Sequence, residues 1–113
     1  MIEKEEIDEI LSRYNLNDIK IGTILSHSSL QILYGAKQEG FKTIGIVTPE
    51  NKEVYSAFTA AKPDIIYEIE TPTDILEEKC QEFLRKENAI IVPTGSFVEY
   101  VKPKNLEEKF LVP

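Results

Sequence analysis

The stretch IKIGTILSHSSLQILYGAKQEGFKTIGIVT, residues 19–48, changes its pattern twice along its length. Residues 19–25 and 42–48 are mostly β-branched or apolar, which is typical of strands. Between them, apolar residues recur at helical spacing, namely Leu30, Ile32, Leu33 and Ala36. Gly40 then suits the left-handed conformation that ends many helices. The stretch therefore predicts a strand, a helix and a second strand, the unit from which parallel sheets are built.

The same alternation continues toward the carboxyl terminus. Residues 64–68 and 89–93 predict a third and a fourth strand, and residues 52–59 a short helix after the second. A longer helix is expected before the fourth strand; it would begin at Thr71-Pro72-Thr73, because proline suits the first helical position, and end at Asn88. Apolar runs without polar alternation fit strands that are covered on both faces. We predict an α/β domain with a small, doubly wound, mainly parallel sheet of strand order 3-2-1-4.

The two ends of the chain carry weaker signals. Residues 2–14 predict a helix, because Ile7, Ile10, Leu11 and Tyr14 follow helical spacing and acidic residues crowd its first turns. The segment from Val101 to Pro113 is polar, and residues 110–112 are a candidate for a last edge element.

Composition narrows the class of protein. A chain of 113 residues is expected to form a single domain, residues 1–113. Its net charge of −7 argues against a general nucleic-acid binder, which needs a basic surface. One cysteine and one histidine cannot make a structural zinc site, so no metal ligands are predicted. No apolar run approaches the about 20 residues that cross a bilayer, and the acidic start is unlike a secretory signal. We therefore expect a cytoplasmic protein with no membrane partner.

In the predicted strand order, strands one and four are neighbours whose helices leave to opposite faces. Such sheets bind ligands in the crevice at that point, outside the carboxyl ends of the strands. The segments that follow these two strands supply the candidate site residues, which are Ser26, His27, Ser28, Thr94, Gly95 and Ser96. A helix start with hydroxyl side chains is a ready anion site, and glycine lets the backbone approach a ligand. Together they predict a cradle for one phosphate group, with His27 as a further donor.

Each of these residues also has a plainer interpretation. Serine at a helix start often serves for capping alone, a lone histidine after a strand is more often structural, and Thr-Gly-Ser is an ordinary loop. The first strand–helix turn contains no glycine, so neither a dinucleotide nor a P-loop signature is present. Glu68, Glu70 and Asp74 could hold a metal or a ribose, but a solvated surface is favoured. Tyr34 and Phe41 are expected in the core, and Cys80 as an inert buried thiol.

Several ordered blocks of the sequence are similar to one enzyme family. They are Glu5-Glu6-Ile7 with Tyr14, residues 26–33, 35–43 and 88–93, Gly95-Ser96-Phe97-Val98 with Tyr100, and residues 110–113. Through these blocks, essentially the whole chain resembles the amino-terminal domain of the archaeal formate-dependent synthetases of purine biosynthesis, the PurP family.

The resemblance implies a Rossmann-like, pre-ATP-grasp domain of a ligase of IMP biosynthesis. Family enzymes make the 5-formamido nucleotide (FAICAR) from the aminoimidazole carboxamide nucleotide (AICAR), formate and ATP. By position, His27 and Ser96 would contact AICAR, whereas catalytic residues stay unassigned. ATP and magnesium would be bound by ATP-grasp domains that are expected after Pro113 and are absent from this chain, so no cofactor is expected here. Family members also assemble into oligomers, so the resemblance makes a homo-oligomer one expected state of this protein.

The chain departs from the family pattern at three places. Leu25 stands where the family has glycine, Thr94 where it has histidine, and residues 48–53 replace a segment that often carries Gly-Arg. Two alternatives therefore stay open: a divergent paralogue with another nucleotide-like substrate, and a stand-alone, non-catalytic module that binds a nucleotide or anion. The reading frame beyond Pro113 and a titration with AICAR would discriminate among them.

Overall fold

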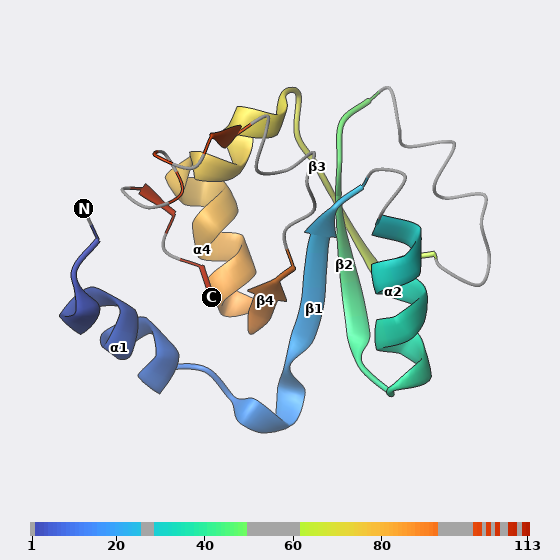
Figure 1. Ribbon diagram of the computed structural model, residues 1–113, viewed down its shortest axis with the longest axis horizontal. Coiled ribbons are helices and arrows are strands. Elements are labelled where there is room, and N and C mark those ends of the chain that lie inside the picture. The colour runs from blue at the N-terminus through green and yellow to red at the C-terminus, as the bar shows by residue number, and fades with distance from the viewer. Residues whose placement is uncertain are drawn as a thin grey trace.

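The computed structural model describes residues 2–25, 29–49, 62–92, 101–102, 104, 106, 109–110 and 112–113. Figure 1 shows the arrangement of the elements. In chain order they are helix α1 (Lys4–Ser12), 3-10 helix η1 (Leu16–Asp18), strand β1 (Lys20–Ile24), helix α2 (Ser29–Gln38), strand β2 (Lys42–Val47), strand β3 (Ile65–Glu68), 3-10 helix η2 (Pro72–Leu76), helix α4 (Glu78–Lys86) and strand β4 (Ala89–Ile91). The short helix predicted at residues 52–59 lies outside the described residues.

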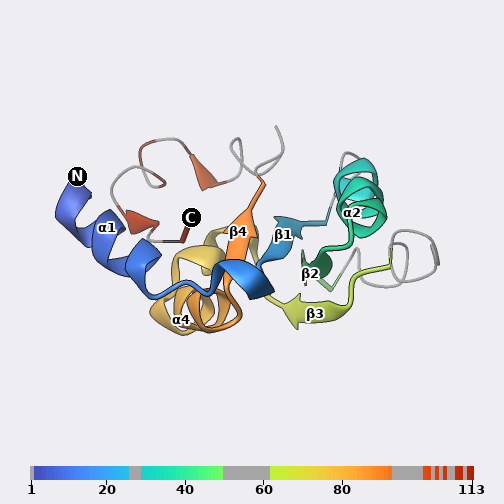
Figure 2. The ribbon, with the colours of Figure 1, turned by 90° about the horizontal axis from the view of Figure 1, so that it is seen from below.

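The four strands form one sheet in the order β3-β2-β1-β4, and all its pairs are parallel. The predicted fold class and strand order are therefore confirmed. β1 lies between β2 and β4, with Gly22 opposite both Ile44 and Ile91. The sheet separates the helices, with α2 on one face and α4 on the other (Figure 2). This arrangement is the doubly wound one, because the chain leaves β1 and β3 toward opposite faces.

The face covered by α4 holds the larger of the two apolar clusters among the described residues. Its buried members come from every strand region, from α4 and from the C-terminal segment: Ile24, Ile44, Ile46, Ile69, Ile75, Cys80, Leu84, Ala89, Ile91, Val101 and Val112. Tyr67 and Phe83 stack at its border with ring centroids 4.6 Å apart. The prediction of a buried thiol is confirmed, since Cys80 is 1% exposed and burial raises its pKa to about 11. The thiol is therefore protonated at neutral pH.

The face covered by α2 holds a smaller cluster of Leu25, Leu33 and Val47, with Leu30 and Ile66 packed against it. The prediction that Tyr34 and Phe41 belong to the core is wrong, because both side chains are more than 40% exposed. α2 turns Leu33 and Ala36 toward the sheet, and the next residue along the helix points about 100° away from Leu33.

The predicted helix ends are confirmed at two positions. Gly40 has φ 87°, and the amides of Gly40 and Phe41 donate to carbonyls of the last turn of α2. Asn88 has φ 57° directly after α4, which also places it in the left-handed region. These two residues turn the chain back into β2 and β4, so that each strand starts beside β1.

The predicted helix from Thr71 to Asn88 is divided into two elements. The Asp74 carboxylate accepts hydrogen bonds from the amides of Glu70 and Thr71 and from the Thr71 hydroxyl, at 3.0–3.1 Å. These bonds close a tight 3-10 turn over Pro72–Leu76, and Glu77 then adopts an extended conformation before α4 begins. Capping by Asp74 therefore outweighs the continuous helical pattern of the sequence.

The outer edge of β4 is covered by the two ends of the chain. The Tyr14 hydroxyl donates to the Ala89 carbonyl at 2.6 Å, and the Ile91 amide donates to the Pro113 carbonyl at 2.7 Å. The described residues of the C-terminal segment form no strand, but Pro113 does lie at the edge where a last element was predicted. Paired groups at a sheet edge leave little free backbone for another chain to join. In the described ranges, no helix has the length and apolar character needed to span a membrane.

Candidate functional site at the carboxyl edge of the sheet

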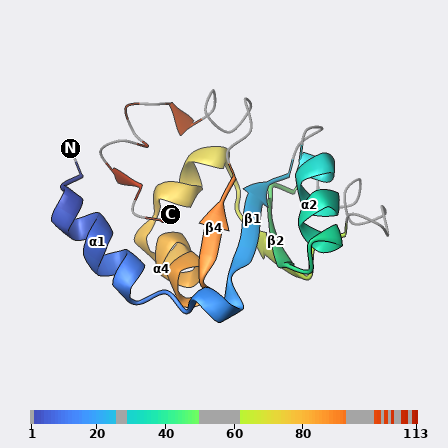
Figure 3. The ribbon, with the colours of Figure 1, turned by 60° about the horizontal axis from the view of Figure 1, so that its bottom comes forward.

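The carboxyl ends of all four strands lie at one edge of the sheet, because the strands are parallel. At the centre of this edge, β1 and β4 end side by side (Figure 3). The chain continues from β1 to α2 on one face, whereas α4 reaches β4 from the other face. This is the topological switch point at which open α/β sheets bind ligands.

Backbone hydrogen bonds fix the starts of both loops at this point. The Leu25 amide donates to the Ile46 carbonyl at 2.8 Å, and the Val92 amide donates to the Gly22 carbonyl at 2.9 Å. The hydroxyl of Thr23, which is fully buried, donates to the Val92 carbonyl at 3.0 Å. The last described residue before each loop is therefore tied to a neighbouring strand. Sequence reasoning missed the role of Thr23, which only the pairing of β1 with β4 makes visible.

α2 begins at the same edge, because it runs back from the end of β1 to the start of β2. Its first residue, Ser29, is fully buried, and its first turn carries no acidic side chain. Lys37 lies in the last turn, where a cation suits the negative end of the helix dipole. The amino-terminal amides of α2 can therefore attract an anion without competition from a carboxylate in that turn.

The six predicted site residues lie outside the described residues: Ser26, His27, Ser28, Thr94, Gly95 and Ser96. Their predicted convergence on one phosphate stays a prediction. The structure does describe the residues that border them, which are Leu25 and Ser29 on one side and Val92 on the other. These border residues belong to neighbouring elements at one edge.

Leu25 is a packing residue, although it directly precedes the predicted site. It is 2% exposed and belongs to the cluster under α2. A Cβ added at Gly45 would come within 3.1 Å of Leu25 Cδ2 and 2.5 Å of Pro63 Cγ. Gly45 therefore leaves room for the Leu25 side chain. A glycine within a strand is the sequence signal for such a close approach.

The acidic residues at the end of β3 and just after it do not gather into a metal site. Asp74 is engaged in the cap described above, and the hydrogen bond from the Thr71 amide lowers the pKa of its carboxyl group, against an opposing effect of burial. Glu68 and Glu70 are exposed. In the described part of the chain, no group of three or more His, Cys, Asp or Glu side chains could hold a metal ion.

Comparisons with known proteins agree on one group of relatives. A family model described as "Protein of unknown function (DUF1246)" matches residues 21–113. Proteins named 5-formaminoimidazole-4-carboxamide-1-(beta)-D-ribofuranosyl 5'-monophosphate synthetase match the whole chain, with 52% identity in Korarchaeum cryptofilum and 45% in Methanocaldococcus jannaschii. In both cases the match covers 31% of the relative, so the chain spans about a third of the length of these curated relatives.

A solved structure supports the same relationship. The crystal structure of an IMP biosynthesis protein PurP from Thermococcus kodakaraensis superimposes with a TM-score of 0.62 and 40% sequence identity. The match covers 79% of this chain and 27% of that chain. Sequence and fold therefore point to the same set of longer proteins.

Proposed function

This chain belongs to the DUF1246 family and corresponds to the amino-terminal part of PurP-type synthetases, and on that premise we propose that it is a substrate-binding domain. The complete protein would be an ATP- and formate-dependent ligase of purine biosynthesis that formylates AICAR to FAICAR. In this proposal the domain binds AICAR, and the remaining two-thirds of such a protein supply the rest of the chemistry. We also propose a cytoplasmic location and assembly into a homo-oligomer, on the resemblance to the family alone.

One observation carries the proposal. β1 and β4 end side by side, and the amino terminus of α2 opens at the same edge with no acid in its first turn. Phosphate is the group of AICAR that such a helix start favours. The 52% identity to a named synthetase over the whole chain makes AICAR the first nucleotide to test.

His27 and Ser96 would hold the phosphate from the two loops. A histidine side chain and a serine hydroxyl both donate hydrogen bonds, and donors to a charged oxygen contribute about 1.5–3 kcal/mol each. Ser26 and Ser28 would add hydroxyls at the start of α2, and Thr94 and Gly95 would complete the other wall. Fixing the nucleotide in one orientation would present its amine to the formyl donor, and orientation is a large part of the rate of a two-substrate reaction.

The described residues of this chain do not fit a site for ATP with magnesium. The sequence carries no phosphate-loop signature, and the described residues hold no cluster of carboxylates for a divalent ion. Formate activation would therefore belong to polypeptide outside these 113 residues. The contribution of this domain would be to bind and orient the acceptor nucleotide.

A second candidate is a divergent paralogue, or a stand-alone module that binds a nucleotide or anion without catalysis. Leu25 and Thr94 favour it, because both depart from the PurP pattern beside the predicted site. A different base or sugar could still place its phosphate at the start of α2. The two candidates differ in ligand rather than in the position of the site.

An NMR titration separates the two candidates. With AICAR, we expect the amide signals of Ser29, Leu30 and Val92 to shift, whereas the riboside that lacks the phosphate should shift them far less. Inorganic phosphate at millimolar concentration should move the signals of Ser29 and Leu30 alone. Phosphate shifts without a response to AICAR would favour the second candidate. No shift at these residues with either compound would contradict both.

A further inference from the structure

α1 has an apolar side that the described structure leaves largely uncovered. The helix buries none of its residues, although Ile7, Ile10 and Leu11 follow helical spacing. Ile7 is 45% and Leu11 46% exposed, and Ile10 is half-buried. α1 stands at the β4 end of the molecule, on the far side from α2 (Figure 3).

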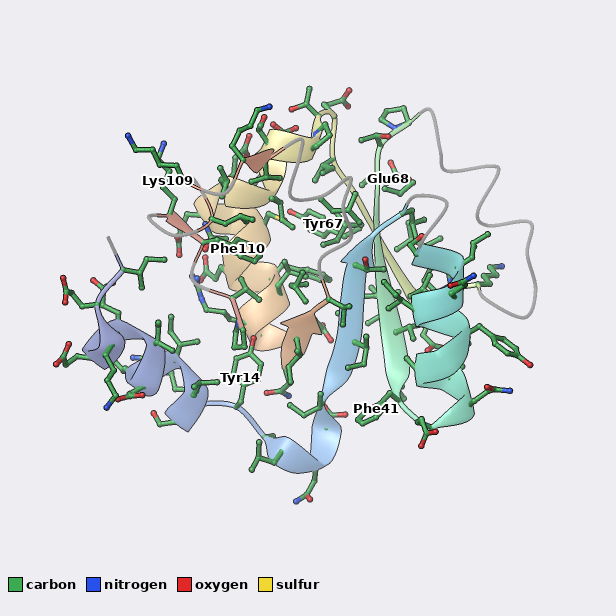
Figure 4. All side chains as sticks on the ribbon, in the orientation of Figure 1. Tyr14, Phe41, Tyr67, Glu68, Lys109 and Phe110 are labelled. Carbon is green, nitrogen blue, oxygen red and sulfur yellow. The ribbon has the colours of Figure 1, made fainter. Side chains whose placement is uncertain are left out.

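Such a helix needs a partner for its apolar side. Helices shorter than about 12–15 residues are marginal in water, and most helical stability in proteins comes from packing an amphipathic face. α1 has nine residues. Among the described residues, the Tyr14 hydroxyl donates to the Ala89 carbonyl and the Asn15 amide donates to the side chain of Asn88. Figure 4 shows Tyr14 just after α1, pointing toward the rest of the domain. These bonds hold the carboxyl end of α1 and leave its apolar side open.

Two hollows that share Ile10 form a groove along α1. The first has a volume of about 160 Å³ and apolar walls, made by Ile7, Ile10, Phe110, Val112 and Pro113. The second has a volume of about 420 Å³ and is lined by Ile10, Arg13, Tyr14, Glu78, Glu82, Arg85, Lys86 and Asn88. Both of its arginines already have partners, because Arg13 pairs with Glu9 and Arg85 with Glu78. Paired charges beside an apolar wall suit polypeptide better than a nucleotide.

The C-terminal segment is anchored so that Pro113 lies in this groove. The buried Gln81 side chain donates to the Lys109 carbonyl at 3.1 Å, and the Ile91 amide donates to the Pro113 carbonyl. The relatives are about three times as long as this chain, which matches 31% of each, at the amino-terminal part. In a protein of that length, the next residues would leave from the groove wall itself.

We propose that the side of α1 formed by Ile7, Ile10 and Leu11, together with Phe110, Val112 and Pro113, is the docking surface for the polypeptide that follows Pro113. This polypeptide places apolar side chains against Ile7 and Ile10 and covers Leu11. The interface joins the nucleotide-binding domain to the rest of the protein at the β4 end, so it leaves the face that α2 covers open.

Photo-crosslinking in the full-length protein tests the proposal. With Ile7 replaced by the photoreactive residue benzoylphenylalanine, illumination should link position 7 to a peptide that begins beyond Pro113 of the same chain. The same replacement at Tyr34, which is 47% exposed on α2, is the matched control and should give no such product. Crosslinks between two chains, or only to peptides within residues 1–113, would overturn the proposal. A reading frame that stops after Pro113 would also overturn it.

Cysteine labelling adds a second readout that does not depend on the photoreactive residue. Leu11 and Tyr34 have nearly equal exposure in the structure, at 46% and 47%, and the native Cys80 is buried. In the full-length protein, a maleimide should label Leu11→Cys about tenfold more slowly than Tyr34→Cys. A thiol that the interface covers reacts only when the interface opens, whereas the thiol on α2 stays exposed. Equal rates would contradict the proposal. Protection that grows with protein concentration would assign the surface to a second copy instead, and would also contradict it.

Discussion

The two faces of the sheet differ in the size of the apolar core that they bury. Under α4, side chains from the sheet, η2 and the C-terminal segment form the larger described cluster. Under α2, three buried side chains, Leu25, Leu33 and Val47, make the core. The helix whose amino terminus opens at the predicted ligand site therefore rests on the smaller core. We therefore expect that the stability of the fold and binding at the predicted site can be perturbed separately.

Two equivalent truncations test this division most strongly. Leu84 under α4 and Leu33 under α2 are both fully buried. We expect Leu84→Ala to lower the free energy of unfolding by about 3–5 kcal/mol, because its surroundings are packed on all sides. Leu33→Ala should cost about 2–3 kcal/mol, because a small cluster near the surface can collapse around the gap. Urea denaturation measures both values, and an equal or larger loss for Leu33→Ala would remove the distinction.

The larger cluster contains the Cys80 thiol, which makes the stability of the fold depend on pH above 9. Burial, with help from the Glu77 carboxylate, raises the pKa of the Cys80 thiol from 9.0 to about 11. Above pH 9 the unfolded chain releases this proton while the native state keeps it, so stability falls as pH rises toward 11. A difference of this size corresponds to about 2–3 kcal/mol. Urea midpoints between pH 8 and 11 should show the decline in the wild type.

The Cys80→Ala variant is the control for this decline. Its stability should change little between pH 9 and 10, although its absolute stability is lower because a buried side chain is lost. Tyr14 contributes at higher pH, since burial raises the pKa of its hydroxyl to about 12. An undiminished decline in Cys80→Ala between pH 9 and 10 would show that another group is responsible.

Two glycines on the α2 side of the sheet differ in the space around them. A Cβ at Gly45 would meet Pro63 and Leu25, so we expect Gly45→Ala to destabilise the fold by about 1–3 kcal/mol and to displace Leu25 beside the site. Gly35 in α2 has nothing within 4 Å of the added Cβ, so Gly35→Ala should be neutral or stabilising by up to about 1 kcal/mol. Thermal denaturation gives the stabilities, and nucleotide titration shows whether Gly45→Ala alone weakens binding. Similar effects at the two positions would contradict this packing.

The sequence alone predicted the sheet because local and topological rules agree there. Apolar runs at 19–25 and 42–48 marked buried strands, and the handedness of parallel crossovers left few orders to choose from. Gly40 and Asn88 adopt the left-handed conformations expected of helix-ending residues. The edge at which the candidate site lies follows from the same order.

The remaining features depend on contacts that spacing does not show. Whether Tyr34 reaches the core depends on how α2 is rotated on the sheet, and the division at Glu77 depends on the bonds that Asp74 makes. α1 was expected from its pattern, but its uncovered apolar side was not. The roles of His27 and Ser96 came from the resemblance and the switch-point rule, and they stay predictions.

Calorimetric titration with AICAR is the most direct test of the proposed nucleotide site. The wild type should bind, and His27→Ala or Ser96→Ala should each weaken binding by roughly 1.5–3 kcal/mol, about tenfold or more in affinity. Ser12→Ala, at an exposed serine in α1, is the matched control and should change nothing. Unchanged affinity in both site variants, with thermal stability preserved, would contradict the placement of the phosphate between the ends of β1 and β4.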